Sequence, residues 1–365
     1  MKLEELDKNF GPDEFDRDDI VFYDARKEPF RIYGLYQPQT EAIFRRMPKA
    51  VADTVSPGVS GLSENTAGGR IRFKTDSPFV AIRADMPAIN PTDNMPMMGQ
   101  SFSLYINRFS GSTYFRSFRY KMNEMMAGKG LNSIVMMPVN EEKVLRDITI
   151  YFPNYASVDN LYIGVQEGAA LLPGDTYRIE KPVVFYGSSI TQGGCASRAG
   201  NCYEDMLSRR FDFDYINLGF SGNAKGEDAM ADYLASLDMS MFVYDYDHNT
   251  PTLEHLQNTH DKLFRKVRAA HPDIPVIFMT APNFDANWNA YTARRNQIFT
   301  NYVRAYEEGD RNVYFVDGER MLGFEGRDAC TVDGCHPNDL GMYRMAEAVG
   351  SAMRGVFEKK DRLQA

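Results

Sequence analysis

The periodicity of the apolar residues changes near residue 180, and this change constrains the fold more than any other feature. Beyond it, short continuous apolar runs alternate with segments of helical periodicity. The apolar runs cover 183–186, 215–218, 241–244, 276–279 and 313–316, and the helical segments cover 202–211, 226–237, 253–270, 287–308 and 341–358. Strands that are apolar on both faces and alternate with helices form a parallel sheet covered by helices on each side. We therefore expect a three-layer α/β/α sandwich around a five-stranded parallel sheet.

The residues before about 175 follow a period of two instead. Apolar and polar residues alternate along 70–74, 80–83, 103–106 and 148–152, and turn residues such as Gly68-Gly69 separate these runs. Such alternation is typical of antiparallel strands with one face in water. Because hardly any helical pattern lies between the strands, the first half predicts an antiparallel β-sandwich of the jelly-roll type.

The length of the chain predicts two domains, because 365 residues exceed what one ordinary core needs. We expect a β-sandwich domain at 1–175, with a substrate-binding or lid role, and an α/β domain at 182–365. The join is expected within 173–182, and no tandem repeat is present.

The charge and hydropathy of the chain exclude several classes of partner. A formal net charge of −9 argues against nucleic acid and against an anionic membrane surface. No apolar run approaches the roughly 20 residues that span a bilayer. The acidic start, residues 1–16, lacks the apolar core of a secretory signal. We expect a cytoplasmic enzyme, or a secreted one if a leader has been removed, and a homo-oligomer is compatible with the sequence.

Three short segments in the second half carry candidate chemistry: GSSIT at 187–191, FSGN at 220–223 and DGCHPND at 333–339. Ser189, Gly222 and Asn249 each follow the end of a predicted parallel strand. Ligands bind beyond the carboxyl ends of such strands, so we expect these three residues to converge at one edge of the sheet.

A catalytic triad is predicted from the last of these segments and Ser189. Asp333 and His336 lie three residues apart beside Pro337, in a turn. A carboxylate in this position accepts the Nδ1–H of the histidine and leaves Nε2 free as a base. Ser189 is then the nucleophile, and His336 takes its proton. The structural alternatives are a helix-capping serine and a surface histidine.

An oxyanion hole is predicted beside the nucleophile. The backbone N–H groups of Ser189 and Gly222 and the side-chain amide of Asn249 are the expected donors. Glycine lets the backbone approach a ligand closely, since it has no β-carbon. The structural alternative for Asn249 is a cap or an Asx-turn ahead of Thr250-Pro251.

These residues resemble the four sequence blocks of the SGNH hydrolase superfamily, the GDSL-type esterases and acylhydrolases. The family's nucleophilic serine, oxyanion glycine, oxyanion asparagine and D-x-x-H pair correspond here to Ser189, Gly222, Asn249, Asp333 and His336. The order and span of the blocks also fit that family's flavodoxin-like α/β/α sandwich.

Two blocks depart from the family pattern. Ser188 replaces the aspartate that precedes the nucleophile. In the third block, Tyr246-Asp247-His248-Asn249 lacks the usual glycine before the asparagine and the aspartate after it. Asp247 and His248 are therefore expected close to the site, where they tune its electrostatics or contact substrate.

A β-sandwich ahead of such a domain resembles the arrangement in bacterial carbohydrate O-acetylesterases, acetylxylan esterases among them. The resemblance implies a cofactor-free serine esterase that removes small acyl groups, acetyl above all, from an oligosaccharide through a covalent acyl-enzyme. Trp288, the only tryptophan, follows the fourth parallel strand and either stacks on a sugar or packs in the next helix.

Three other functions stay open at this point. The same residues serve a lipase-like esterase of another small molecule, or acyl transfer to a sugar instead of to water. A third alternative, from a different class, is a non-catalytic carbohydrate-binding protein.

The cysteines are expected to be reduced and largely buried, and no metal is expected. They are Cys195, Cys202, Cys330 and Cys335. A zinc site at Cys335-His336 is the alternative, but the cysteine spacings are loose for one, and zinc would occupy the histidine that the esterase needs. Disulfides are a further alternative, with a connectivity that the sequence does not specify.

Overall fold

The structure is a computed structural model, and it describes residues 17–89, 97–108, 111–138, 143–282, 285 and 287–364, without the side chains of 97 and 358–364. The acidic start, on which the expectation of a cytoplasmic enzyme depends, lies outside the described residues. Within those ranges, no helix combines the length and the hydropathy that crossing a membrane requires.

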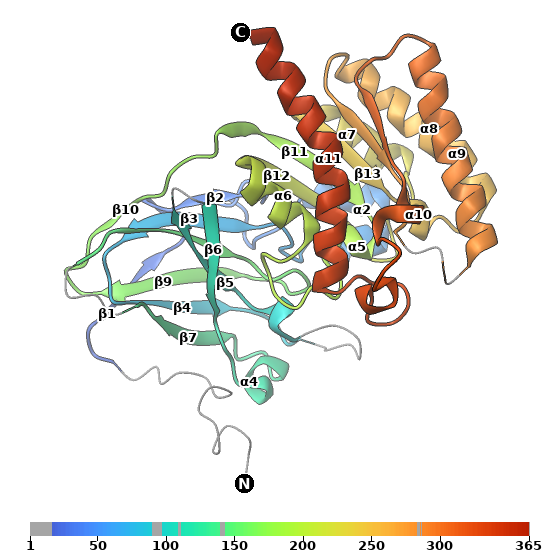
Figure 1. The fold of residues 1–365 in the computed structure, drawn as a ribbon. Coiled ribbons are helices and arrows are strands. Elements are labelled where there is room, and N and C mark those ends of the chain that lie inside the picture. The colour runs from blue at the N-terminus through green and yellow to red at the C-terminus, as the bar shows by residue number, and fades with distance from the viewer. Residues whose placement is uncertain are drawn as a thin grey trace. The chain divides into compact units, whose positions relative to one another are not determined.

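The chain forms two compact units (Figure 1). The first contains the residues up to Arg46, Glu64–Tyr177 and Ser197–Gly200. The second contains Met47–Ser63, Arg178–Ala196 and the chain from Asn201 onward. The passage at Tyr177 and Arg178 falls within the predicted join, whereas Met47–Ser63 comes from the first half of the chain and belongs to the second unit.

The first unit consists of two antiparallel sheets, as the alternating pattern predicts. One has the order β1-β9-β4-β7, with β1 at Ile20–Asp24, β4 at Phe79–Asp85, β7 at Leu131–Met136 and β9 at Asn160–Gln166. The other has the order β10-β3-β8-β5-β6, with β2 paired to β3. Its strands are β2 Arg31–Tyr33, β3 Arg70–Thr75, β5 Ser103–Arg108, β6 Gly111–Ser117, β8 Arg146–Tyr151 and β10 Leu171–Pro173. The helical turns η2 Met97–Gln100 and α4 Met122–Met126 lie between strands.

Alternate residues of both sheets form one apolar core in the first unit. Ile71 and Phe73 of β3 are fully buried there, and so are Val80 and Ile82 of β4. Ile163 of β9 joins the same cluster. The period-two pattern therefore identifies the inward face of each strand.

The second unit contains the predicted five-stranded parallel sheet, with the order β12-β11-β13-β14-β15. The strands are β11 Ile179–Gly187, β12 Phe213–Gly219, β13 Met241–Asp245, β14 Val276–Met279 and β15 Val313–Val316. The helical segments are α5 Ser189–Gln192, α6 Tyr203–Phe211, α7 Asp228–Ser236, η3 Asp247–Asn249, α8 Leu253–Ala270, α9 Trp288–Glu307, α10 Gly318–Met321, η4 Arg327–Cys330 and α11 Asp339–Gln364.

Both faces of this sheet are buried, which explains why its strands are continuously apolar. Val184 and Tyr186 of β11 belong to one core with residues of α7, α8 and α9. Val183 and Phe185 of the same strand belong to a second core with residues of α6 and α11. The α/β/α layering predicted from sequence is confirmed (Figure 1).

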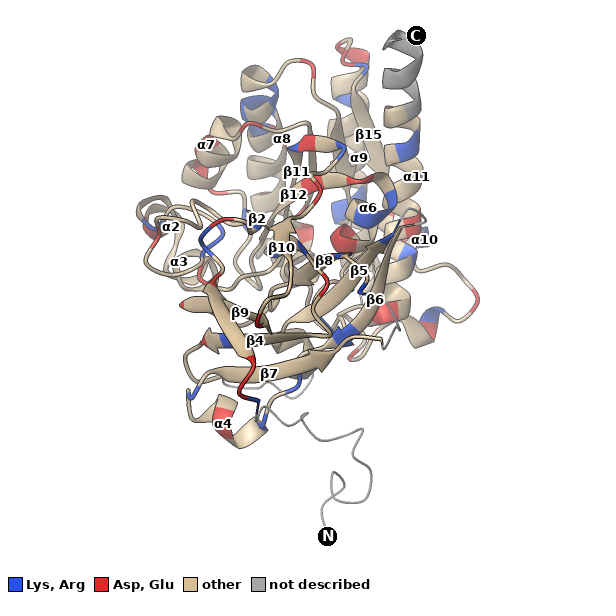
Figure 2. Ribbon diagram, turned by 90° about the vertical axis from the view of Figure 1, so that its left-hand side faces the viewer, with Lys and Arg blue, Asp and Glu red and all other residues tan. Residues whose placement is uncertain are grey.

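Two short helices were not predicted. Helix α2 covers Lys49–Val55 and α3 covers Pro57–Leu62, and α2 packs against α7 (Figure 2). Ala52 and Val59 are fully buried in the core of the second unit. Neither helix has enough turns to show a clear apolar stripe, which explains why the first half shows hardly any helical pattern in its sequence.

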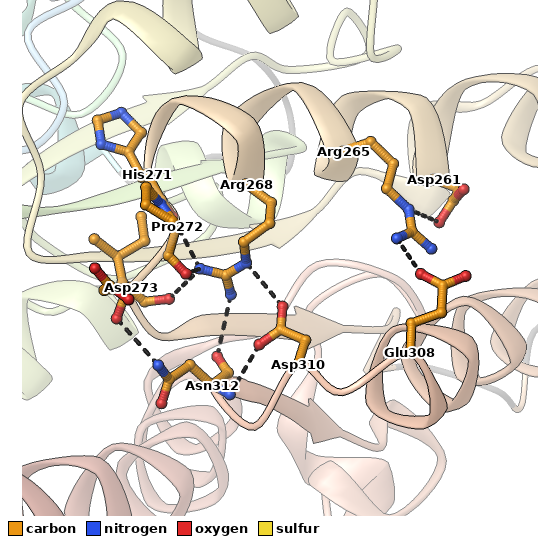
Figure 3. A network of polar contacts seen from close by, with 10 residues as sticks. Asp261, Arg265, Arg268, His271, Pro272, Asp273, Glu308, Asp310 and Asn312 are labelled. Atoms are coloured by element: carbon orange, nitrogen blue, oxygen red, sulfur yellow. Dashed lines mark hydrogen bonds and ion pairs between the residues drawn. The ribbon is translucent and has the colours of Figure 1, made fainter.

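The amino-terminal edge of the parallel sheet is held by ion pairs (Figure 3). Arg268, near the end of α8, lies 2.8 Å from Asp310, just before β15. It also donates to the backbone carbonyls of His271, Pro272 and Ile274. Since these groups pair with one another, the network is structural and fastens α8 to the loops that lead into β14 and β15.

Candidate active site

Ser189 lies at the turn between β11 and the one-turn helix α5. The preceding Ser188 is the N-cap, because its hydroxyl accepts a hydrogen bond of 3.2 Å from the Ile190 N–H. A β-carbon at Gly219, the last residue of β12, would overlap the backbone of Thr191 and Gln192. Glycine therefore lets α5 sit directly on the end of the neighbouring strand, and Ser188 has a capping role where the family has an aspartate.

Ser189, His336 and Asp333 form one line of hydrogen bonds. Ser189 Oγ lies 2.9 Å from His336 Nε2, and His336 Nδ1 lies 2.7 Å from Asp333 Oδ2. The other oxygen of Asp333 accepts the backbone N–H groups of Cys335 at 2.9 Å and of His336 at 2.7 Å. These two donors hold the carboxylate in place, so that Oδ2 faces the imidazole.

The turn that carries the histidine is closed on itself. Thr331 and Pro337 form an antiparallel bridge, and the Val332 N–H donates to the His336 carbonyl at 3.0 Å. Gly334, at the tip, has φ of +79°. A single local motif therefore places both the imidazole and its carboxylate.

Gly222 lies on the loop after β12, with φ of +67°. A β-carbon there would meet nothing within 4 Å, so the backbone conformation rather than crowding accounts for the glycine. Among the described residues nothing accepts a hydrogen bond from its N–H, and the residue is exposed. The loop is tied to α5, because the Ser221 N–H donates to Gln192 Oε1 at 3.0 Å.

Asn249 ends η3, the turn after β13, and contacts the same glycine loop. Its Nδ2 donates to the Phe220 carbonyl at 3.0 Å. Helix α8 is capped by Thr252, whose hydroxyl accepts from the His255 N–H at 3.1 Å, so Asn249 does not serve as that cap. One of the two amide hydrogens of Asn249 holds the loop, and the second is available as a donor. Hydrogen bonds thus connect the ends of β11, β12 and β13, as predicted from the positions of the three motifs.

Asp247 is buried and has a structural role. Its two oxygens accept the backbone N–H groups of Ala281 and His248, each at 3.1 Å. Burial raises the pKa of Asp247 to about 6. The residue therefore joins η3 to the end of β14, and no described contact assigns it to a substrate.

His248 is close to the triad. Burial, with the neighbouring His336, lowers the pKa of His248 to about 4, so its imidazole is neutral near pH 7. Its ring packs against Tyr291 with the centroids 5.3 Å apart. Within the described residues its Nε2 is buried without a hydrogen-bond partner. A buried ring nitrogen of this kind needs a water or a ligand group as its partner.

Trp288 begins α9 and its side chain is 52% exposed, so it is not part of the core. Residues 283, 284 and 286, just before it, lie outside the described residues, so the surroundings of the indole are described only in part. Its stacking on a sugar stays a prediction.

Two buried carboxyl groups near the end of β13 were missed from sequence. Asp245, at the end of β13, accepts a hydrogen bond from Thr191 of α5, and its other oxygen has no partner among the described residues. Glu204 is wholly buried nearby. Burial raises the pKa of both groups well above the ordinary range, which favours their protonated forms. The position of Asp245 after an apolar run was a weak signal, and Glu204 offered none.

The four cysteines are free thiols. Burial raises the pKa of Cys195 to about 12, and it raises the pKa of Cys335 as well, which disfavours the reactive thiolate. Across the described part of the chain, no group of three or more His, Cys, Asp or Glu side chains is placed to hold a metal ion.

Two family profiles match the chain. A profile of the GDSL-like lipase/acylhydrolase family matches residues 180–354, and one for the N-terminus of SGNH-hydrolase-type esterases matches residues 20–171. The chain belongs to the SGNH hydrolase superfamily. As an SGNH hydrolase it is a carboxylic ester hydrolase by family. No curated protein matches it significantly in sequence.

Solved structures resemble this SGNH hydrolase over most of its length. A GDSL-like lipase from Bacteroides ovatus ATCC 8483 is 28% identical, with a TM-score of 0.81 over 93% of this chain and 98% of the other. A salicylyl-acyltransferase from a tetracycline biosynthetic pathway is 17% identical, with a TM-score of 0.75 and the same coverage. A family two carbohydrate esterase from Clostridium thermocellum is 13% identical, with a TM-score of 0.59 over 80% of this chain and 94% of the other. At such low identity the last two share the fold with this chain.

Proposed function

We propose that this SGNH hydrolase is a serine esterase that removes small acyl groups, acetyl above all, from carbohydrate esters. The single observation that carries the proposal is the continuous line from Ser189 Oγ through the imidazole of His336 to the carboxylate of Asp333. A serine hydroxyl is a weak nucleophile unless a base in this position takes its proton. No other group needs to move for that transfer.

The reaction proceeds in two steps in this proposal. His336 Nε2 takes the Ser189 proton as Oγ attacks the ester carbonyl, and Asp333 stabilises the imidazolium. The Gly222 N–H, the free amide hydrogen of Asn249 and the Ser189 N–H stabilise the oxyanion. The alcohol leaves with the proton from His336, and water then releases the acyl group from Ser189 by the same route.

The carbohydrate substrate rests on fold likeness to carbohydrate esterases. Besides the clostridial enzyme, an acetyl xylan esterase from Butyrivibrio proteoclasticus shares the fold over 93% of this chain, at 12% identity. His248 and Trp288 are the proposed substrate contacts, one through its unpartnered Nε2 and the other through its exposed indole. We also propose a cytoplasmic address, which favours short oligosaccharides over intact polymers.

The test is hydrolysis of nitrophenyl acetate and of acetylated xylo- and manno-oligosaccharides by the wild type and by Ser189→Ala. The variant is expected to lose turnover by at least about 10³-fold with an unchanged circular dichroism spectrum. Ser236→Ala, an exposed site on α7, is the matched control. Unchanged turnover in Ser189→Ala would discard the assignment, and a preference for octanoate over acetate would favour a lipase-like esterase.

Acyl transfer is the second candidate function, because an acyltransferase shares the fold over 93% of this chain. The same residues would form the acyl-enzyme, and a sugar hydroxyl would replace water as the acceptor. Product analysis with and without an acceptor sugar separates the two: an acylated acceptor formed faster than free acid identifies a transferase.

A further inference from the structure

Helix α3, which the first half of the chain contributes to the second unit, lies against the loop of Gly222. Its Gly58 faces the side chain of Asn223, the residue after Gly222. A β-carbon at Gly58 would lie 2.8 Å from Asn223 Nδ2 and closer still to its other carboxamide atoms. Real β-carbons do not approach other atoms so closely, so only glycine lets the two segments meet.

The glycine has no backbone reason to be at this position. Ser56 caps α3 through the Val59 N–H at 3.1 Å, and Pro57 occupies the first turn, as is usual for a helix start. The φ of Gly58 is not in the left-handed region. Glycine weakens a helix relative to alanine, and the overlap that any β-carbon at Gly58 would make with Asn223 accounts for its presence here.

The side chain that packs on Gly58 also shapes the loop around Gly222. Asn223 Nδ2 donates to the Ser221 carbonyl at 2.7 Å, and the Asn223 N–H donates to the Phe220 carbonyl at 2.9 Å. Gly222 lies between these bonded groups, and its own N–H has no acceptor among the described residues. Moving the Asn223 carboxamide would therefore turn the Gly222 N–H.

We propose that Gly58 is a positioning residue for the oxyanion hole: its missing side chain lets α3 hold Asn223, and Asn223 aims the Gly222 N–H at the reacting carbonyl. This inference rests on the proposed function, because it gives that N–H its catalytic task. It assigns the Met47–Ser63 segment a role in the chemistry of the second unit.

The experiment compares Gly58→Ala with Gly61→Ala. Gly61 lies in the same helix, and a β-carbon there would meet nothing within 4 Å, so it is a matched control. Removal of one oxyanion donor costs about 10²–10³-fold in kcat, so a displaced donor in Gly58→Ala is expected to cost about 10- to 100-fold. KM changes little, because the donor acts on the transition state. Gly61→Ala keeps wild-type kcat and KM.

Two further measurements separate positioning from general damage to the fold. Ser189 Oγ adds to the carbonyl carbon of a trifluoromethyl ketone, with its proton passing to His336, and the adduct carries an oxyanion. The Ki of such a ketone should therefore rise in Gly58→Ala by about the same factor as kcat falls. In an Asn223→Ala background, which is itself slower, Gly58→Ala should cost nothing further, since the overlapping carboxamide is gone. Thermal unfolding of each variant shows that it is folded at the assay temperature.

The outcomes distinguish this inference from the proposed function. Retained activity in Ser189→Ala overturns the proposed function. Loss of activity in Ser189→Ala, with Gly58→Ala as active as Gly61→Ala, overturns only the positioning role. An equal loss from Gly58→Ala in both the wild-type and the Asn223→Ala backgrounds also overturns it.

Discussion

The hydrogen bond between Ser189 and His336 joins residues 147 positions apart in the chain. Each partner is nevertheless prepared locally. Ser188 caps the helix that carries the nucleophile, and two backbone N–H groups hold the carboxylate of Asp333 beneath its own histidine. The geometry of the candidate site therefore depends on short local motifs, which explains why it could be proposed from the sequence.

Asn249 is predicted to contribute to the rate through its amide hydrogen. Asn249→Ala should lower kcat about 10²–10³-fold, because one oxyanion donor is lost. Asn249→Asp has nearly the same shape but only accepts hydrogen bonds, so it should lose at least as much. Steady-state kinetics on nitrophenyl acetate measures both.

Thr252→Ala is the matched control for Asn249. It removes the cap of α8 three residues away and should cost about 1 kcal/mol of stability with no change in kcat. An Asn249→Asp enzyme with wild-type kcat would show that the amide does not donate in the transition state.

At the scale of elements, the two edges of the parallel sheet have different tasks. At the carboxyl edge, two polar groups of the site, the Gly222 N–H and His248 Nε2, have no partner among the described residues. At the amino edge, Arg268 has carbonyl and carboxylate partners on all its sides (Figure 3). Polar groups without a hydrogen-bond partner in the protein are available to a substrate, whereas polar groups that are paired within the protein stabilise the fold.

Arg268→Ala is predicted to destabilise the second unit by about 2–3 kcal/mol, because it leaves a partly buried carboxylate and several carbonyls without their donor. Arg265→Ala, one turn earlier on α8, should cost less than about 1 kcal/mol, since its ion pairs with Asp261 and Glu308 are more exposed than the pair of Arg268 with Asp310. Urea unfolding followed by circular dichroism gives both values. Equal losses for the two variants would contradict the structural role assigned to the Arg268 network.

At the scale of the whole molecule, buried acids couple stability to pH. Asp245 faces Thr191 and lies near Asp247, and burial raises its pKa well above the ordinary value. In the folded protein the Asp245 carboxyl group therefore keeps a proton that it releases above about pH 4 in the unfolded chain. Stability is therefore highest at low pH, as far as this group is concerned, and falls as pH rises towards the folded pKa.

Asp245→Asn is predicted to stabilise the protein increasingly as pH rises. The amide still accepts from Thr191 and cannot ionise, so its advantage over the wild type should grow by up to about 1.4 kcal/mol per pH unit between pH 5 and 8. Asp228→Asn, at an exposed carboxylate on α7, should show no growing advantage. Urea unfolding across that pH range tests this, and parallel curves for wild type and Asp245→Asn would contradict it.

The sequence by itself determined the fold class of each half and the positions of the parallel strands along the chain. It also pointed to the five residues of the candidate site. It did so because burial on one or both faces of a strand leaves a period in the apolar residues, and because the triad turn at 333–336 and the glycine loop are local. Tertiary structure alone decided the rest. Helices α2 and α3 are too short to show a period, and their place in the second unit follows from burying Ala52 and Val59 there. The contact of Gly58 with Asn223 joins residues remote in the chain, so no local pattern encodes it.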